Sequence, residues 1–436
     1  MNMTDPHTAD FERLVAAGPA WLSDARHAAL LRFRERGLPT PRDEEWKYTD
    51  VAALAKADFR LADEIDIEAA RRLLPTAAVF DGVQLVFVHG AYVAELSRSV
   101  PQTGLDILPL SQTDATTAER WQARIGQAAA REGDPFGSLN AAMLRDGALI
   151  RIARGSEIPD PIHLIFLTPG ASRPLASHPY VAVIAEEQTS ATILESYVGE
   201  DSAPYLTNAS TDLTLEAGAR LRHYRVQREG SQAFHIGTVR ARQNRDSRFS
   251  SIAVSLGAKL SRTNIETVLD GPGSECDVDG LYLGEGSQHH DHRTSIDHQH
   301  PRTTSRELYK GILDDRATGV FNGKVFVRPH ALKSDARQMN HNLLLSDNAE
   351  VDTKPQLEIF ADDVRCSHGA TIGRLEETAL FYLQSRGIDR SMARNVLIYA
   401  FANELVGRIA VPIVRSRLAG ILEARFGLPG AGTEGI

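Results

Sequence analysis

Cysteine is scarce in this sequence: the chain has two, Cys276 and Cys366, and no Cys-x-x-Cys. A disulfide framework is therefore excluded as a main source of stability, and in a reducing compartment we expect both residues to be thiols. A cluster held by four cysteines is also excluded for this chain alone. Any such cluster would need ligands from a second chain.

Long apolar runs are missing as well. No stretch approaches the roughly 18–20 apolar residues that span a bilayer, and the start, Met-Asn-Met-Thr-Asp-Pro-His, lacks the basic and apolar segments of a signal peptide. We therefore expect a cytoplasmic protein with no membrane partner. The formal net charge is -9 and no Lys/Arg block occurs. Nucleic acid is not an expected partner, because phosphate binding requires concentrated positive charge.

Nucleotide motifs are also lacking. The segment 319–325, Gly-Val-Phe-Asn-Gly-Lys-Val, has neither the spacing nor the hydroxyl of a phosphate-binding loop. No Gly-x-Gly-x-x-Gly follows a strand and opens a helix, and no Gly-x-Ser-x-Gly elbow is present. The sequence offers no place for ATP hydrolysis or for nucleotide redox chemistry.

The chain is long enough for more than one structural unit, with 436 residues of which 42% are hydrophobic and 24% charged. Residues 1–146 are expected to be mostly helical. Apolar residues at helical spacing from Trp21 to Phe33 predict a helix that ends at Gly37. Residues 84–93 predict a pair of strands around a turn at His89-Gly90. Two further helices are predicted, over about 113–130 and 136–144.

Residues 147–371 predict a long succession of short strands. Turn segments begin at leucines separated by steps of 13, 14, 30 and 32 residues: Leu256, Leu269, Leu283, Leu313 and Leu345. The two short steps fit single edges of a coil, and the two long ones approach a full coil of several strands. A β-sandwich would place its strands about 8–12 residues apart. Over 200 residues of strand without a break therefore favour a stacked β-solenoid.

Residues 372–436 are expected to be helical again, with helices over about 375–385, 390–408 and 411–426, and Asp389 as an N-cap. The Gly-rich tail after them is expected to be disordered. These helices could cover an open end of the solenoid, or their exposed faces could bind a partner. Their aromatic residues are expected to lie mostly in the core, because apolar residues at helical spacing indicate packing first: Phe381, Tyr382, Tyr399 and Phe401.

The first candidate site is the tripeptide Cys366-Ser367-His368. Residues two apart on a strand point to the same face, so Cys366 and His368 should project together. Thiolate and imidazole suit iron or zinc, and the same pair could serve as nucleophile and base. Residue types alone favour a structural interpretation, a buried cysteine beside a hydrogen-bonded histidine.

The second candidate is a cluster of five histidines within twelve residues: His289, His290, His292, His298 and His300. Gly284, His290 and His292 fit the beginning of a cupin metal motif, Gly-x5-His-x-His. The rest of that motif fails, since only Asp297 could replace its Glu and no Gly lies between Gly286 and Gly311. A solvated polar edge between coils is the favoured interpretation, ahead of a metal site, with a polar partner interface between the two.

Several stretches resemble the motifs of one known family. They are Glu44-Glu45-Trp46-Lys47-Tyr48-Thr49; Glu307-Leu308-Tyr309-Lys310-Gly311; Phe321-Asn322-Gly323-Lys324; residues 352–371, Asp-Thr-Lys-Pro-Gln-Leu-Glu-Ile-Phe-Ala-Asp-Asp-Val-Arg-Cys-Ser-His-Gly-Ala-Thr; and Phe381-Tyr382-Leu383-Gln384-Ser385-Arg386-Gly387-Ile388. Together they resemble the SufD family. The resemblance covers most of the chain and is strongest from about residue 250 to 405.

The resemblance implies a scaffold subunit of a sulfur-mobilisation system that builds iron–sulfur clusters, not an enzyme. Such a scaffold pairs with a SufB-like sister scaffold and binds a SufC-like ABC-type ATPase. The fold implied is mainly β, a right-handed parallel β-helix flanked by N- and C-terminal helical regions. A homodimer is conceivable when the chain is alone.

The resemblance also implies functional residues. Cys366 and His368 become candidates for contact with a nascent, transient iron–sulfur cluster, with His368 as an iron ligand or relay and a cysteine from the sister scaffold. Leu383, Arg386 and Ile388 become candidates for contact with the ATPase. SufB-like chains carry more cysteines and Glu-His-Glu-Ala-Thr where this chain has Ser-His-Gly-Ala-Thr. That departure favours the supporting scaffold over the sulfur-accepting one.

Two alternatives remain open at the level of sequence. One is a β-helical enzyme, either carbohydrate-active or metal-dependent, that uses the His289–His300 cluster. The other is an inert adaptor for an ATPase.

Overall fold

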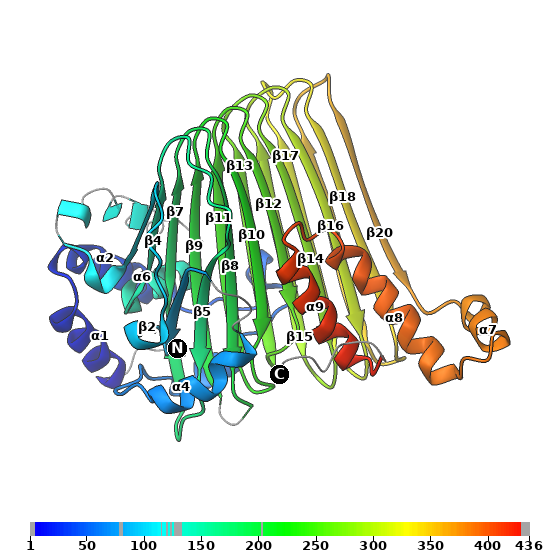
Figure 1. Ribbon diagram of the computed structural model, residues 1–436, viewed down its shortest axis with the longest axis horizontal. Coiled ribbons are helices and arrows are strands. Elements are labelled where there is room, and N and C mark those ends of the chain that lie inside the picture. Colours follow the sequence, from blue (N-terminus) through cyan, green and yellow to red (C-terminus); the bar gives the residue numbers. More distant parts are fainter. Residues whose placement is uncertain are drawn as a thin grey trace.

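The structure, a computed structural model, is an elongated parallel β-solenoid with helices along its sides (Figure 1). It describes residues 5–77, 82–114, 116–118, 121–122, 124–125, 133–201 and 204–428. The tail beyond residue 428, for which disorder was predicted, lies outside the described residues. The predicted mainly β fold, a parallel β-helix flanked by helical regions, is confirmed.

Two parallel sheets form the solenoid. Sheet 1 has the strand order β2-β1-β5-β8-β10-β12-β14-β16-β18-β20, and sheet 2 has the order β19-β17-β15-β13-β11-β9-β7-β4-β3 with β6 beside β9. The strands of sheet 1 are β1 (Gln84–Val88), β2 (Ala91–Tyr92), β5 (Ile162–Thr168), β8 (Ser190–Gly199), β10 (Arg220–Arg228), β12 (Arg248–Ser255), β14 (Glu275–Gly284), β16 (Thr304–Leu313), β18 (Asp335–Leu344) and β20 (Arg365–Gly373). Those of sheet 2 are β3 (Leu105–Pro109), β4 (Gly147–Ile152), β6 (Leu175–Ser177), β7 (Tyr180–Ala185), β9 (Tyr205–Leu215), β11 (Phe234–Gln243), β13 (Leu260–Leu269), β15 (His289–His298), β17 (Thr318–Val327) and β19 (Glu350–Ile359).

Successive coils repeat at an interval of about thirty residues. Thr263 of β13 lies opposite His292 of β15, which lies opposite Phe321 of β17, so each step here is 29 residues. Corners recur at the same interval: Gly286 and Asp315 both have positive φ, of 61° and 51°. The long turn steps predicted from sequence are therefore full coils, and the short ones are the single edges between strands of opposite sheets.

The interior of the solenoid is filled by stacked side chains from successive coils. Phe87, Phe166 and Tyr197 lie on three neighbouring strands of sheet 1, with ring centroids 5.1 and 4.7 Å apart. They belong to one continuous apolar cluster that runs the length of the solenoid. Burying this cluster requires neighbouring coils on both sides, which is why a single coil would not be stable.

The N-terminal helices cover the outer face of sheet 2. They are α1 (Asp5–Ala17), α2 (Ser23–Arg36), α3 (Ala52–Lys56), α4 (Ile67–Leu73) and α6 (Pro135–Met143), with short 3-10 turns η1 (Ala20–Leu22), η2 (Glu44–Trp46), η3 (Leu74–Thr76), η4 (Ala94–Leu96) and η5 (Leu110–Gln112). Phe33, Trp46 and Phe59 pack there against Phe234 and Leu260 of the sheet. By contrast, α4 packs against sheet 1.

Several local predictions for this region are confirmed. The predicted helix from Trp21 onward corresponds to α2, and Gly37, with φ 68°, ends it. The predicted strand pair is the antiparallel pair β1–β2. Much of the helix predicted over 113–130 lies outside the described residues; the described parts, 116–118, 121–122 and 124–125, are helical.

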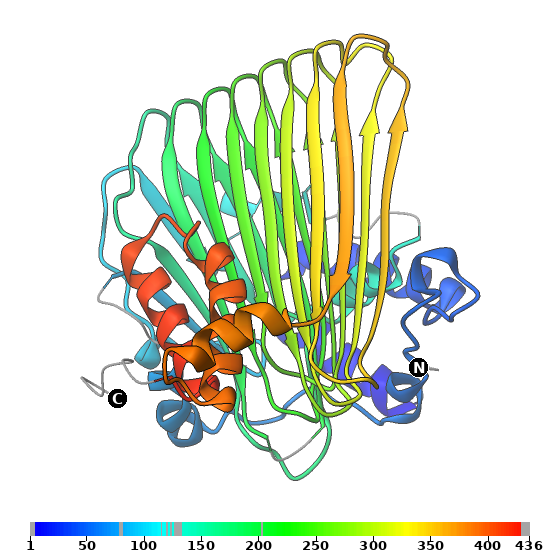
Figure 2. The same cartoon turned by 90° about the vertical axis from the view of Figure 1, so that its right-hand side faces the viewer.

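The C-terminal helices lie against the outer face of sheet 1: α7 (Glu377–Ser385), α8 (Arg390–Val406) and α9 (Pro412–Arg425). Asp389 caps α8 as predicted, since its Oδ1 accepts hydrogen bonds from the backbone N–H groups of Ser391 and Met392 at 3.0 and 3.1 Å. Apolar residues of α8 and α9 pack against strands β8 to β18. These helices therefore do not cover the C-terminal end of the solenoid, as the sequence had allowed. That end is open in the end-on view of Figure 2.

The aromatic residues of the C-terminal helices differ from expectation. Tyr399 and Phe401 are half-buried against sheet 1. Phe381 and Tyr382 are not core residues: they are 72% and 57% exposed. The reason is that α7 extends beyond β20, away from the sheet on which α8 and α9 pack (Figure 1). Within the described part of the chain, we find no helix with the length and apolar character needed to cross a membrane.

Candidate functional site

The last coil, β19 and β20, forms the open end of the solenoid. β19 pairs only with β17 and β20 only with β18, so both are edge strands. Most residues of β16 are buried, whereas those of β20 are mainly exposed. Exposed apolar side chains lie at this last coil: Ile359, Phe360 and Ile372. The inner faces of both strands lack the neighbouring coil that would cover them.

Cys366 and His368 lie on β20 at this open end. Cys366 is half-buried and packs against the end of the interior apolar cluster, and this burial raises the pKa of its thiol. His368 is exposed, and its side chain has no hydrogen-bond partner among the described residues. The structural interpretation that residue types favoured, a buried cysteine beside a hydrogen-bonded histidine, is therefore wrong for the histidine.

A polar pair lies directly behind His368 in the solenoid. In register, His368 of β20 neighbours Gln338 of β18, which neighbours Glu307 of β16. Gln338 is buried, and its Nε2 donates to Glu307 Oε2 at 2.7 Å. Burial raises the pKa of the Glu307 carboxyl to about 7. Gly323 makes room for this pair, because a Cβ there would lie 2.1 Å from Gln338 Nε2.

The two cysteines share one column of the interior. Cys276 of β14 is followed in register by Ser305, Ala336 and Cys366 on successive strands of sheet 1. Three strand spacings of about 4.8 Å place the cysteine backbones roughly 14 Å apart, which is beyond disulfide distance. Cys276 is fully buried, and burial raises the pKa of its thiol well above the usual value. Of the two, only Cys366 lies at the open end.

The histidine cluster is not a solvated edge, so that interpretation was wrong. His290, His292 and His298 are fully buried. His292 stacks on Tyr282 with ring centroids 4.9 Å apart, and His298 bonds the hydroxyls of neighbouring residues. His289 faces the opposite side, where its Nε2 lies 3.0 Å from the hydroxyl of Thr49. The alternation of strand residues divides the cluster between the interior and the outer face of sheet 2.

Helix α7 carries the candidates for partner contact. Leu383 and Ile388 are half-buried, and Arg386 is exposed. The guanidinium of Arg386 lies 5.4 Å from the ring centroid of the exposed Tyr382. Together with Phe381, these residues give the helix an apolar and aromatic surface that carries one positive charge. Surfaces of this composition are enriched at protein interfaces.

An ionic network inside the solenoid was missed by the sequence analysis. The guanidinium of Arg225 donates to Glu195 at 2.9 Å and lies 2.7 Å from His235 Nε2, and His235 Nδ1 lies 2.6 Å from Glu229. All four residues are buried. Glu195 and Arg225 lie exactly opposite each other in register, 30 residues apart. Opposite charges at the coil interval were the signal that could have revealed this pair.

The candidate site is incomplete in a single chain. Among the residues that the structure describes, no group of three or more His, Cys, Asp or Glu side chains could hold a metal ion. The open end offers one thiol and one imidazole on adjacent positions of the same face. Such a pair can contribute to a metal or cluster site, and a second chain must supply the remaining ligands.

Comparison with known families agrees with this architecture. The family described as "SUF system FeS cluster assembly, SufBD core domain" matches residues 166–401, and "SufBD protein N-terminal region" matches residues 7–164. The chain therefore belongs to the SufBD family of iron–sulfur cluster assembly proteins. Within it, the chain is a member of the SufD family, as the sequence motifs predicted.

Relatives resemble this chain over most of its length. The Escherichia coli iron–sulfur cluster assembly protein SufD is 35% identical over 379 residues, which cover 86% of each chain. A Synechocystis iron–sulfur cluster assembly SufBD family protein is 36% identical over 402 residues, 89% of this chain and 87% of the relative. The Bacillus subtilis SufD is 25% identical over 421 residues, 93% and 94% of the two chains.

Proposed function

We propose that this chain is a non-catalytic scaffold subunit that acts in the cytoplasm by pairing with a SufB-like sister scaffold through the open end of its solenoid. The single observation that carries the proposal is that both strands of the last coil are unpaired edges with uncovered inner faces. Exposed edges readily accept strands from another chain, and folded proteins usually block them. A sister solenoid seated on this end would continue both sheets.

The nascent iron–sulfur cluster, as cargo of the complex, would form at that interface. His368 is exposed there and would serve as an iron ligand or relay, with Cys366 beside it on the same strand face. The two residues cannot complete a four-ligand site, so the sister scaffold would supply cysteine. The cluster would then be transient and shared, and this chain alone would retain none.

We also propose that a SufC-like ABC-type ATPase binds the C-terminal helices through Leu383, Arg386 and Ile388 on or beside α7. The exposed Phe381 and Tyr382 lie on the same helix and would extend that contact. Closure of an ATPase dimer would pull on the helices of both scaffolds and open the interface at β20. Such an opening can be shifted only by the difference between the ATPase's affinities for the closed and open states.

The pairing is tested by co-purification of this chain with the two partners. Ile372→Glu and Phe360→Glu place charges on the open end and should abolish recovery of the sister scaffold, while the ATPase is still recovered. Leu332→Glu is a matched control, because Leu332 is exposed to a similar degree outside the last coil. Undiminished recovery of the sister scaffold with both open-end variants would contradict the proposed interface.

Two other functions make different predictions for the same complex. A β-helical enzyme using the histidine cluster would require stoichiometric metal on the isolated chain, lost in His290→Ala and His292→Ala. An inert adaptor would give the same cluster yield after substitution of both Cys366 and His368. A homodimer in the absence of the sister scaffold is compatible with the proposal, because the same open end could pair with a second copy.

A further inference from the structure

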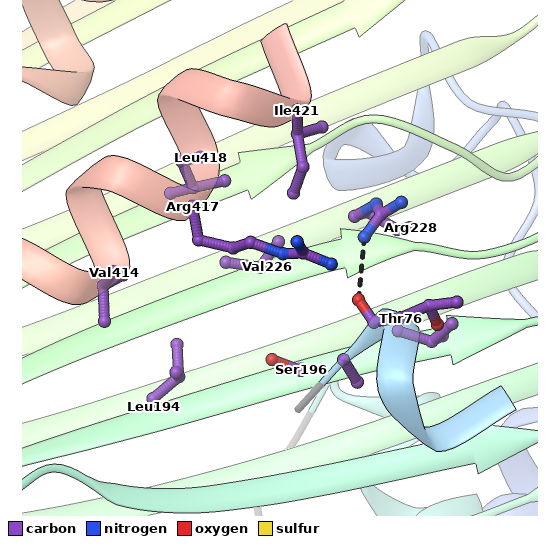
Figure 3. Close-up of a pocket in the computed structure, with 11 residues that line it drawn as sticks. Thr76, Leu194, Ser196, Val226, Arg228, Val414, Arg417, Leu418 and Ile421 are labelled. Atoms are coloured by element: carbon purple, nitrogen blue, oxygen red, sulfur yellow. Dashed lines mark hydrogen bonds between the residues drawn. The ribbon is translucent and has the colours of Figure 1, made fainter. Parts of the chain in front are cut away.

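A small cavity lies far from the open end, where three parts of the chain meet. Its floor is the outer face of sheet 1 at β8 and β10, its roof is α9, and one side is formed by Thr76 and Ala77 at the end of η3 (Figure 3). The cavity has a volume of about 30 Å³. Its walls are largely apolar, from residues such as Leu194, Val226 and Leu418.

Two arginines extend their guanidinium groups into this cavity. Arg228 comes from β10 and Arg417 from α9, and Figure 3 shows the side chain of Arg417 directed toward that of Arg228. Arg228 donates to the backbone oxygen of Thr76 at 3.0 Å. Arg417 has no hydrogen-bond or ion-pair partner among the described residues, and its Nε is buried. No carboxylate is among the residues that line the cavity.

This arrangement is electrostatically unfavourable as it stands. Burial lowers the pKa of Arg228, and the positive charge of Arg417 lowers it further. Two like charges repel more strongly in a partly desolvated site than in water. A buried guanidinium donor without an acceptor adds a desolvation cost. One anion between the two groups would relieve the repulsion and satisfy the free donors together.

The remaining features of the cavity define what kind of anion fits. A guanidinium presents its N–H groups as a planar fork that matches the oxygens of phosphate, sulfate or carboxylate. Ser196 adds a hydroxyl to the lining and is hydrogen-bonded at 2.8 Å to Nε2 of the buried His163. A water molecule needs at least about 10–15 Å³ of such volume. A cavity of about 30 Å³ therefore holds only a compact ligand.

We propose that this cavity binds a small inorganic oxyanion of the phosphate or sulfate class, held between Arg228 and Arg417. The anion connects the N-terminal turn η3, the solenoid and helix α9, which otherwise meet here through apolar contacts. This site is independent of the proposed scaffold function, because it involves none of the residues of the open end or of α7.

The binding is tested on the purified full-length chain with inorganic phosphate as the probe. Thermal unfolding is followed at constant pH and ionic strength while phosphate replaces chloride, and affinity is measured by titration calorimetry. A ligand that binds only the folded state raises the Tm as its concentration increases. We expect a saturable rise in the wild type. Loss of one charge-assisted contact should weaken binding about tenfold or more in Arg228→Gln and in Arg417→Gln.

Arg415→Gln is the matched control, because Arg415 is an exposed residue of the same helix and does not line the cavity. Its phosphate response should equal that of the wild type. In chloride alone, Arg417→Gln should be at least as stable as the wild type, since one of two repelling charges is removed. The proposal is overturned if the wild type shows no saturable phosphate effect, if both cavity variants retain it, or if Arg415→Gln loses it equally.

Discussion

Gln338 and Glu307 form a buried hydrogen bond one strand behind His368: Nε2 of Gln338 donates to Oε2 of Glu307 at 2.7 Å. Thr294 also hydrogen-bonds the Glu307 carboxyl from the opposite sheet, whereas the nearby Asp279 acts on it as a like charge. Burial is the largest influence, and it favours the protonated carboxyl. Glu307 therefore connects the solenoid's interior to the open end through neutral hydrogen-bonding groups.

The raised pKa of Glu307 predicts a pH dependence of folding stability. The folded chain holds this proton up to about pH 7, whereas the unfolded chain loses it near the model value of 4.5. Stability from this group is thus fully present below pH 4.5 and is lost as the pH rises through 7. The difference corresponds to on the order of 3 kcal/mol. In Glu307→Gln that part of the pH dependence should disappear, so the variant should gain stability over the wild type between pH 5 and 8.

The measurement is urea unfolding at several pH values across that range. Asp279 is the necessary comparison, because burial raises its pKa to about 6 in the same window while Arg408 opposes the shift. Asp279→Asn should remove a separate portion of the pH dependence. Identical pH profiles of wild type and Glu307→Gln would show that this carboxyl is ionised in the folded chain.

How far the sequence predicts this structure depends on whether the relevant signal is local. Strand alternation and turn residues are local, and they were sufficient for the long run of strands and for the coil interval of 30 and 32 residues after Leu283. The contacts between coils are not local. Glu195 meets Arg225, and Gln338 neighbours His368, only when residues 30 apart are placed in register.

The same limit explains the two errors at the candidate sites. Alternation places His290 and His292 on one face of a strand, but does not reveal that this face is the closed interior of a solenoid. For Phe381 and Tyr382, helical spacing indicates an apolar surface without showing whether another element covers it. The motif around Cys366 identified the family, whereas its exposure depends on β20 being the last strand.

The buried ion pair of Glu195 and Arg225 predicts a large loss of stability when one partner is removed. Arg225→Met leaves the Glu195 carboxylate without its guanidinium partner in the interior, and such a change typically costs about 3–5 kcal/mol. Arg222→Met on the same strand should cost little, because Arg222 is exposed. Chemical unfolding measures both. The double variant Glu195→Leu/Arg225→Met should recover part of the loss, and no recovery would show that the pair's other contacts dominate.

The exposed surface of α7 predicts a separable effect on ATPase binding. Phe381→Ala removes an aromatic side chain that is 72% exposed and contributes little to the core, so folding stability should be unchanged. Arg386→Glu reverses the single charge of that surface. Each should weaken binding of the SufC-like ATPase at least about tenfold, since aromatic and Arg residues dominate interface energetics. Gln384→Ala, an exposed residue of the same helix, is the control in a titration with purified ATPase.

Cluster formation should depend more on His368 than on Cys366. The imidazole of His368 is exposed on the last strand and can reach iron without rearrangement, whereas Cys366 is half-buried against the interior apolar cluster. Anaerobic reconstitution of the assembled complex, read by visible absorption and by iron and sulfide content, compares the two positions. His368→Ala should reduce cluster yield severalfold and leave complex formation intact, while Cys366→Ala should reduce it less. His330→Ala, an exposed histidine of the turn before β18, should have no effect. Unchanged yield in His368→Ala would remove that residue from the mechanism, and a larger effect of Cys366→Ala would reverse the proposed order of the two ligands.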